Sequence, residues 1–234
     1  ELLENDFCFT LQGPVGTHKS LFFKKLAIYP EFFGEGLTGL DIEKKDLVVS
    51  GTNKWIVELG EVDSTLKKEQ TGLRAFITNT TDRYRPPYGR EDMDFPRITC
   101  YCATVNTRDF IREGDDSRRW VVFPIKEIDF TKLKIDFVKQ LWAEIYEQYK
   151  VTPTIYRLNE NDIKKVIFLN RGFQVSLPGE EELINNLNWI IPPDQWTWLS
   201  NIDVKNMFKE NLDFSIDRID PKKISYALNQ YQVN

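Results

Sequence analysis

Short apolar runs alternate with helical patterns over the first 150 residues, which is the order typical of an α/β fold. Apolar, β-rich runs predict strands before Gly13, over Lys54–Val62, over Arg97–Asn106 and over Val121–Ile125. Helical periodicity predicts helices at Lys19–Leu26, Asp63–Thr78 and Phe130–Tyr149. Strands separated by helices usually pair in parallel, so we predict a central, mainly parallel sheet.

The periodicity also predicts which faces are buried. Leu66, Leu73, Phe76 and Ile77 would form the buried face of the second helix, and Phe137, Leu141, Ile145 and Tyr149 a core stripe on the third. Pro30, Gly34, Gly36 and Gly39 predict an irregular loop over Ile28–Asp46. We also expect a short helix at Thr107–Arg112, before a turn at Gly114.

The last third of the chain reads as a separate helical module. A helix is expected over Tyr156–Leu169, capped by Asn159 with Asp162 three residues later. Two more, Asn201–Phe208 and Pro221–Tyr231, fit a helix-turn-helix or winged-helix unit. We therefore predict domains at residues 1–150 and 151–234. Acidic residues outnumber basic ones in the second, which favours a packing or partner surface over DNA binding.

Composition narrows the class of protein. The 234 residues are 41% hydrophobic and 29% charged, as in soluble globular domains, and the net charge of −5 restricts any nucleic-acid contact to a local surface. Cys8, Cys100 and Cys102 fit buried reduced thiols, and a single histidine excludes a histidine-based metal centre. With no membrane span or secretory signal, we expect a protein of the cytoplasm, and the start at Glu1 suggests a fragment of a longer chain.

The junction between the first strand and the first helix is a candidate phosphate-binding loop. Its residues are Gly13, Pro14, Val15, Gly16, Thr17, His18, Lys19, Ser20 and Leu21. The pattern G-x-x-x-x-G-K-[ST] needs amide groups, a lysine for phosphate and a hydroxyl for Mg²⁺, but His18 replaces its second glycine. Gly16 would take over part of the bending. The alternative is a purely structural strand, turn and helix that bind no ligand.

Acidic and amide groups follow two of the predicted strands. Glu58 and Glu61 lie at the end of the strand that contains Trp55, where an NTPase needs one acid for Mg²⁺ and one for the attacking water. Glu58 suits the metal and Glu61 the base, although the reverse assignment and a merely exposed acidic turn stay open. Asn106, at the end of the next long strand, could hold the water or the γ-phosphate.

Two arginine-containing segments are candidate binding elements. The first offers Arg83, Tyr84, Arg85, Tyr88 and Arg90 around a Pro-Pro pair, and cations interleaved with aromatic rings suit single-stranded nucleic acid. A solvated turn with the arginines paired to Asp82, Glu91, Asp92 and Asp94 is the alternative. The second segment places Arg118 and Arg119 just before a strand, where they could stabilise charge in phosphoryl transfer, in a neighbouring subunit if they project outward.

Five segments in this order resemble the virulence-associated protein E (VapE) family over about Phe7–Tyr149. They are QGPVGTHKSLFFKKLA, KDLVVSGTNKWIVELGEV, DRYRPPYGR, FPRITCYCATVN and DDSRRWVVFPI. The resemblance implies a P-loop NTPase of phages and mobile genetic elements, related to superfamily-three helicases within the AAA+ group. It implies Lys19 and Ser20 on phosphate and Mg²⁺, Glu58 and Glu61 as the acidic pair, Asn106 as the polar sensor, and Arg118 or Arg119 as an arginine finger. The arginine-tyrosine segment would match a hairpin that grips single-stranded DNA.

The expected function is therefore an ATP- and Mg²⁺-dependent ATPase that acts on DNA, single-stranded or as a helicase's duplex substrate. It would support replication of a mobile element in a bacterial host cell, as a homo-oligomer and by analogy a hexameric ring. A nucleotide-gated module that binds DNA or a partner without unwinding is the rival function. A small-molecule kinase is a third, for which the sequence shows no acceptor pocket or lid.

Overall fold

The computed structural model describes residues 7–37, 53–60, 62, 67–86, 88–111, 117–175, 200, 202–203 and 206. The chain divides into two compact units, Glu1–Gln174 and Val175–Asn234. All of the labelled strands and helices belong to the first unit.

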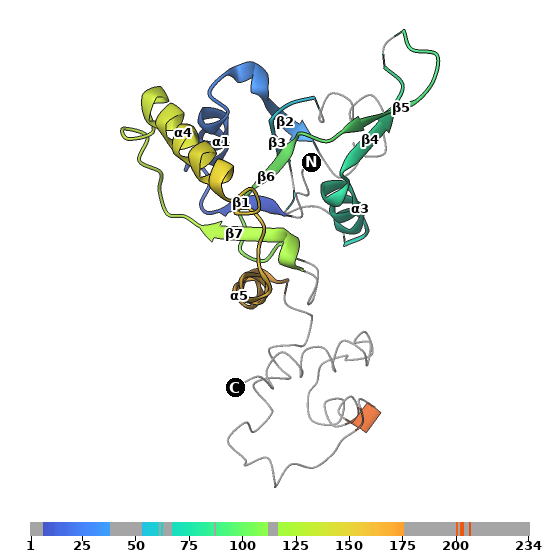
Figure 1. Ribbon diagram of the computed structural model, residues 1–234. Coiled ribbons are helices and arrows are strands. Elements are labelled where there is room, and N and C mark those ends of the chain that lie inside the picture. The colour runs from blue at the N-terminus through green and yellow to red at the C-terminus, as the bar shows by residue number, and fades with distance from the viewer. Residues whose placement is uncertain are drawn as a thin grey trace. The chain divides into compact units, whose positions relative to one another are not determined.

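A five-stranded sheet organises the first unit (Figure 1). Its strands are β1 (Cys8–Gln12), β2 (Phe33–Leu37), β3 (Ile56–Leu59), β6 (Cys100–Val105) and β7 (Trp120–Pro124). They lie in the order β2-β3-β6-β1-β7, and every neighbouring pair is parallel. The predicted α/β fold with a mainly parallel sheet is confirmed.

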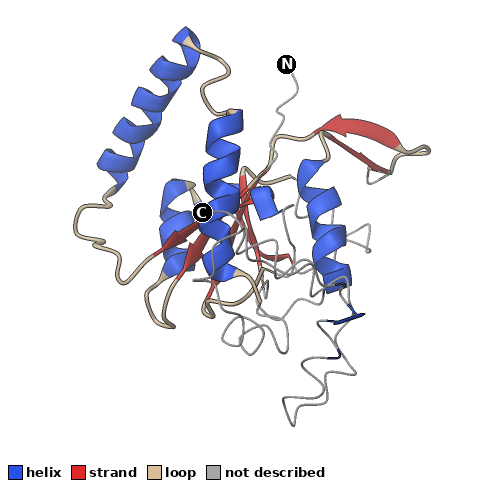
Figure 2. Cartoon of the chain, turned by 90° about the horizontal axis from the view of Figure 1, so that it is seen from below, coloured by secondary structure: helices blue, strands red, loops and turns tan. Residues whose placement is uncertain are grey.

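Helices and one hairpin lie between these strands or, for the last two helices, after β7. The helices are α1 (Lys19–Leu26), α3 (Lys67–Thr78), α4 (Ile135–Val151) and α5 (Glu160–Asn170), with 3₁₀ turns at Pro30–Phe32, Ser117–Arg119 and Arg171–Phe173. Between α3 and β6, strands β4 (Thr81–Tyr84) and β5 (Met93–Pro96) pair as an antiparallel hairpin. Figure 2 shows this hairpin extending away from the main sheet.

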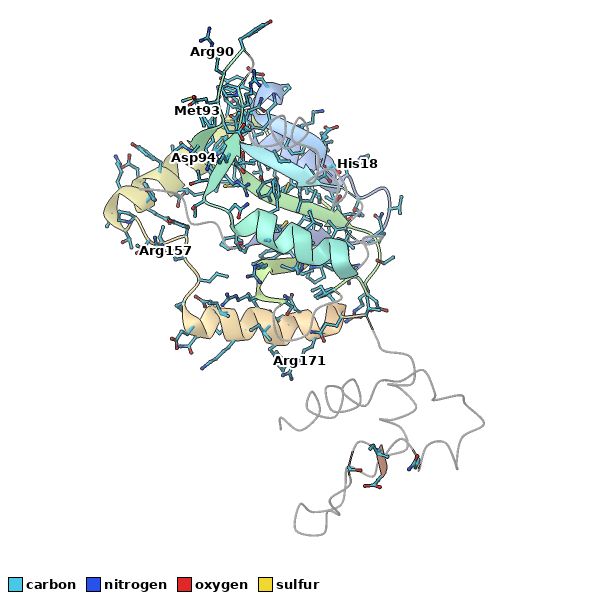
Figure 3. All side chains as sticks on the ribbon, turned by 90° about the vertical axis from the view of Figure 1, so that its right-hand side faces the viewer. His18, Arg90, Met93, Asp94, Arg157 and Arg171 are labelled. Atoms are coloured by element: carbon cyan, nitrogen blue, oxygen red, sulfur yellow. The ribbon has the colours of Figure 1, made fainter. Side chains whose placement is uncertain are left out.

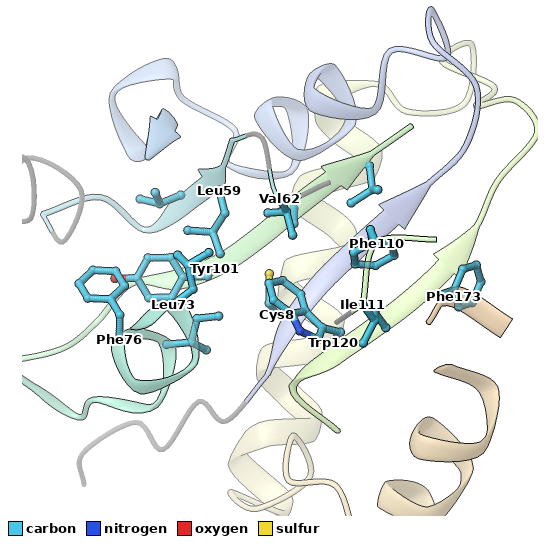
Figure 4. Packing of buried hydrophobic residues seen from close by; sticks show 14 residues of the cluster. Cys8, Leu59, Val62, Leu73, Phe76, Tyr101, Phe110, Ile111, Trp120 and Phe173 are labelled. Carbon is cyan, nitrogen blue, oxygen red and sulfur yellow. The ribbon is translucent and has the colours of Figure 1, made fainter. Parts of the chain in front are cut away.

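The two faces of the sheet are buried against different helices. On one face, Val57, Tyr101, Ala103 and Trp120 pack with Leu73, Phe76 and Ile77 of α3 (Figure 4). On the other, Leu11, Ile56 and Cys102 pack with Phe23 of α1 and with Ala27 just after it, and Trp55 and Trp142 join them. Because side chains alternate along a strand, every second residue of β3 and β6, counted from Ile56 and Cys102, faces α1.

Two predictions of local structure are wrong. Part of the expected irregular loop over 28–46 forms the edge strand β2, where Gly34 allows close approach: a Cβ at that position would lie 3.1 Å from the Val57 side chain. The segment expected as a helix at Thr107–Arg112 is not helical over 107–111. There, the amides of Phe110 and Ile111 both donate to the Phe173 carbonyl, which satisfies them outside a helix.

The core stripe expected on α4 is wrong at three of its four residues, and the fourth, Leu141, is only half-buried. The side chains of Phe137, Ile145 and Tyr149 are 53%, 40% and 39% exposed, whereas Val138 is buried. The helix contacts the core through Val138 and through Trp142, whose indole N–H donates to the Leu26 carbonyl at 2.8 Å. Since α1 has only 8 residues against 17 in α4, it covers only part of the longer helix.

Helix α5 packs on the sheet and extends the first unit beyond the predicted boundary at residue 150. It begins with the expected capping box, in which the Asp162 amide donates to the Asn159 side chain at 3.0 Å. At its end, buried Asn170 donates to the carbonyls of Ser117 and Trp120, both at 2.7 Å. These bonds tie α5 to the start of β7, so the compact unit ends after Gln174.

In the second unit, almost all of the predicted helices lie outside the described residues. At the expected start of the first, Ile202, Asp203 and Asn206 are helical. The Asp203 amide donates to Ser200 Oγ at 3.1 Å, and the Ser200 amide donates to the Asp203 carboxylate at 2.9 Å. Both bonds form a reciprocal cap, and the bonds from Ser200 lower the pKa of Asp203.

Candidate functional site

The loop that leaves β1 is held between the ends of two other strands. The Gly13 amide donates to the Val105 carbonyl at 3.0 Å, and the Ile125 amide donates to the Gln12 carbonyl at 2.8 Å. A Cβ at Gly13 would lie 2.5 Å from the Ile125 carbonyl oxygen, so only glycine fits there. The loop thus lies at the carboxyl ends of the parallel strands, where open α/β sheets bind ligands.

Two left-handed residues shape the loop. Gly16 has φ 86°, and His18 has φ 57° and caps α1 in the conformation that the usual glycine would adopt more readily. The exposed His18 ring meets the edge of Phe130 at a centroid distance of 6.2 Å. The substitution at position 18 is therefore compatible with a left-handed turn, and Gly16 shares the bending as predicted.

Lys19 is buried and directs its ammonium group back onto the loop. Lys19 Nζ donates to the carbonyls of Gly13 and Pro14 at 2.8 and 2.9 Å, and to the Asn106 side-chain oxygen at 3.0 Å. Thr17 Oγ1 also donates to the Pro14 carbonyl at 2.9 Å. Val15 is 81% exposed and Leu21 39%, so the loop's outer side faces away from the core.

Ser20 and Glu58 meet across the end of the sheet. Ser20 Oγ donates to Glu58 Oε1 at 2.8 Å, and Thr104 Oγ1 donates to the same oxygen at 2.6 Å. Glu58 lies two residues after Ile56 on β3, and Thr104 lies two residues after Cys102 on β6. Both side chains therefore point to the face of the sheet that α1 covers. The strand order places β6 between β3 and β1, which explains how its side chains reach both.

These contacts join the loop, the acid and the amide that the sequence singled out. Lys19 and Ser20 begin α1, and they bond respectively to Asn106, just after β6, and to Glu58 on β3. Glu61, the predicted base, lies outside the described residues.

Arg118 and Arg119 lie at the other end of the sheet from this loop. They precede β7, whose first residue pairs with Cys8, whereas its last residue, Pro124, pairs with Gln12 beside the loop. The bonds from Asn170 hold the turn that carries both arginines. Within one chain the structure therefore does not bring them to Lys19.

The arginine-tyrosine segment forms the β4–β5 hairpin and its tip. Arg83 is 71% exposed, with its Nε 3.8 Å from Asp94, and Tyr88 is fully exposed. Arg85 Nε donates to the Gly89 carbonyl at 2.6 Å, and Tyr84 stacks on Phe95 with ring centroids 4.3 Å apart. Figure 3 shows Arg90 at the outer end of the hairpin.

A buried ion pair anchors the hairpin's base. Arg97 Nε donates to Asp82 Oδ2 at 2.8 Å, and the two side chains are only 3% and 6% exposed. The same guanidinium bonds to the Phe76 carbonyl and lies 4.5 Å from the centre of the Phe76 ring. Asp82 therefore pairs with Arg97. The alternative from the sequence had paired Asp82 with the arginines of the arginine-tyrosine segment, to which Arg97 does not belong.

The family model for the virulence-associated protein E-like domain matches residues 3–171. The chain belongs to this family. A search of the curated proteins finds no match. Among solved structures, the chain is similar to the apo C-terminal region (305–718) of NrS-1, with 15% identity over 82% of this chain and 52% of that one, at a TM-score of 0.48. The A form of that region gives 16% identity over 73% and 35%, at 0.41. The chain thus spans about half or less of these structures.

The matched span of this VapE-like domain includes all of α5, which agrees with the packing of that helix on β7. Among the described residues, no helix is long and apolar enough to cross a membrane. All three cysteines are free thiols, as predicted, and Cys8 and Cys102 are buried as expected, whereas Cys100 is only half-buried. Burial raises the pKa of each thiol, which keeps them protonated.

Sequence reasoning missed three residues of the VapE-like domain's site and hairpin. Thr104 lies two residues before Asn106, so strand periodicity alone would have placed both side chains on one face. Arg97 and Phe130 gave no comparable signal, since their partners Asp82 and His18 are distant in sequence.

Proposed function

We propose that this domain binds and hydrolyses ATP, with Gly13–Leu21 as its phosphate-binding loop. The observation that carries the proposal is the hydrogen bond between Ser20 and Glu58, because it joins the loop's hydroxyl to a strand-end carboxylate. A helix N-terminus, a buried lysine and a strand-end amide at the same place are the groups that a triphosphate requires.

The donor set fits Mg²⁺. A serine hydroxyl and a carboxylate are hard oxygen ligands, and two such protein ligands beside substrate phosphates are typical of magnesium sites. Ser20 and Glu58 would hold the ion, which when bound neutralises charge on the phosphates.

The remaining roles belong to the chain's own groups. Lys19 would exchange its loop carbonyls for phosphate oxygens, and Asn106 would orient the water or the γ-phosphate. Glu61, beyond the Glu58 strand, would take the proton of the attacking water. Arg118 and Arg119 would act on the nucleotide of a neighbouring copy in a ring, because their own loop is at the other end of the sheet.

We further propose that hydrolysis serves an action on DNA, helicase-like and suited to replication of a phage or other mobile element. The exposed arginines of the β4–β5 hairpin and exposed Tyr88 at its tip support contact with a single strand, whose phosphates attract cations and whose bases stack on rings. Arg83→Ala combined with Arg85→Ala should weaken binding of single-stranded DNA and flatten its salt dependence. Unchanged affinity would make the hairpin only a surface feature.

The decisive experiment measures ATP hydrolysis with and without DNA. If DNA stimulates ATP hydrolysis and Lys19→Ala abolishes that hydrolysis, the result supports an ATP-driven motor that acts on DNA. As a matched control, Lys24→Ala removes an exposed α1 lysine that pairs with Glu35 at 2.9 Å, and it should leave turnover unchanged.

A nucleotide-gated binding module without unwinding is the second candidate. Two observations favour it: His18 holds a left-handed turn with a side chain present, and Lys19 is bonded to the loop's own carbonyls. Nucleotide binding without turnover, with or without DNA, would support this module over the motor.

A further inference from the structure

Glu58 receives two hydroxyl hydrogen bonds on one oxygen. Ser20 Oγ lies 2.8 Å and Thr104 Oγ1 2.6 Å from Oε1, and no described residue donates to Oε2. Ser20 belongs to the phosphate-binding loop, whereas Thr104 lies on β6. Neither the phosphate-binding motif nor the acidic pair predicted from the sequence includes Thr104.

The position of Thr104 is fixed by the sheet. β6 pairs with β3 in a register that sets Leu59 opposite Ala103, so Glu58 and Thr104 lie on adjacent strands on the face that α1 covers. Glu58 is 7% exposed and Thr104 is half-buried. A hydrogen bond to a buried carboxylate is charge-assisted and short, and it restricts the rotation of the carboxylate plane.

We propose that Thr104 is a positioning residue, which orients the Glu58 carboxylate so that Oε2 is directed to Mg²⁺ or its water shell. If Ser20 Oγ were to bind the ion in place of Glu58, Thr104 would still donate to Oε1 and hold the carboxylate in place. The inference deepens the proposed function and rests on it. Residues that orient a metal's ligands typically change metal affinity about 10- to 100-fold when they are removed.

The test measures the Mg²⁺ concentration that half-saturates binding of a fluorescent N-methylanthraniloyl-ADP. Thr104→Val keeps the shape and the β-branch but removes the hydroxyl, and should raise this concentration about 10-fold or more. Thr104→Ser restores the donor and should return it toward the wild-type value. Thr10→Val is the matched control: among the described residues, this buried threonine on β1 donates only to the Cys8 carbonyl and sulfur of its own strand. Loss of its hydroxyl should leave the Mg²⁺ requirement unchanged.

A double-variant cycle tests whether Thr104 acts through Glu58. In a Glu58→Gln background, Thr104→Val should add little, because the group that it orients has already lost its charge. Two results would overturn the positioning role and leave the proposed function standing. The first is that Thr104→Val shifts the half-saturating Mg²⁺ concentration equally in both backgrounds. The second is that Glu58→Gln shifts this concentration whereas Thr104→Val leaves it at the wild-type value. Wild-type protein that binds no nucleotide at any Mg²⁺ concentration would overturn the proposed function and this inference together.

Discussion

At the scale of single residues, the backbone at position 18 is the least expected feature of the loop. The motif's glycine is there to adopt a left-handed conformation, and His18 adopts it with φ 57°. Histidine is among the side chains that enter this region more often than most, whereas a β-branched residue rarely does. The departure from the motif thus changes the side chain more than the path of the chain.

This comparison predicts different effects of two substitutions at position 18: glycine should be nearly neutral and valine destabilising. His18→Gly should keep the free energy of unfolding within about 1 kcal/mol of wild type, because relief of the left-handed cost offsets the extra entropy of the unfolded chain. His18→Val should lower it by about 1–2 kcal/mol, since a branched Cβ opposes this conformation. Urea unfolding of the first unit measures both changes, and equal losses for glycine and valine would contradict the strained turn.

The site's residues were predictable to different degrees for a physical reason. Lys19 and Ser20 carry a local motif, and Glu58 and Asn106 end predicted strands, so parallel pairing alone brought their ends together. Thr104 depends on the order of strands, which local periodicity does not specify. Its role became visible only when β6 was found between β1 and β3.

At the scale of elements, the hairpin depends on one buried ion pair. Arg97 and Asp82 are almost completely buried, and Arg97 also contacts the last turns of α3 through Phe76. The pair therefore links the hairpin's base to the helix that follows the Glu58 strand. A charge left without its partner in such a place is strongly destabilising.

We accordingly expect Asp82→Asn to lower the free energy of unfolding by about 3–5 kcal/mol, measured by urea denaturation. Replacing both partners by apolar residues, Asp82→Leu with Arg97→Met, should recover most of that loss. Arg83→Ala, one residue away but exposed, should change it by about 0.5 kcal/mol or less. A loss of similar size for Asp82→Asn and Arg83→Ala would show that the buried pair does not anchor the hairpin.

Hydrophobic periodicity predicted the type of most elements but not what covers each face. It identified β1, β3, β6 and β7, and the Leu73, Phe76 and Ile77 face of α3 is buried as expected. It failed for β2, where two glycines mask a strand, and for α4, where the apolar stripe runs on past the short helix that packs against it. Burial depends on the length of a neighbouring element, which a sequence pattern does not contain.

At the scale of the whole molecule, the two charged centres lie at opposite ends of one sheet. The loop follows Gln12 and the arginine turn precedes Trp120, and the register of β1 with β7 separates them by the length of a five-residue strand. Arg119 lies one residue before the Trp120–Cys8 pair and Gly13 one residue after Gln12, so six steps of roughly 3.3 Å separate them, on the order of 20 Å along the strands. A head-to-tail ring would bring the arginine end of one copy to the loop end of the next.

This geometry predicts complementation between two inactive variants. Lys19→Ala disables a loop but keeps its arginines, and Arg118→Ala with Arg119→Ala keeps the loop but loses the arginines, so each alone should show little ATP hydrolysis. In a randomly mixed ring, about a quarter of the interfaces pair an intact loop with intact arginines, so mixing should recover activity of that order. Light scattering on each variant must first show the same assembly as wild type. If correctly assembled mixtures stay as inactive as the two parent variants, the arginines do not act across the interface. If the arginine variant alone keeps full turnover, the arginines have no part in ATP hydrolysis.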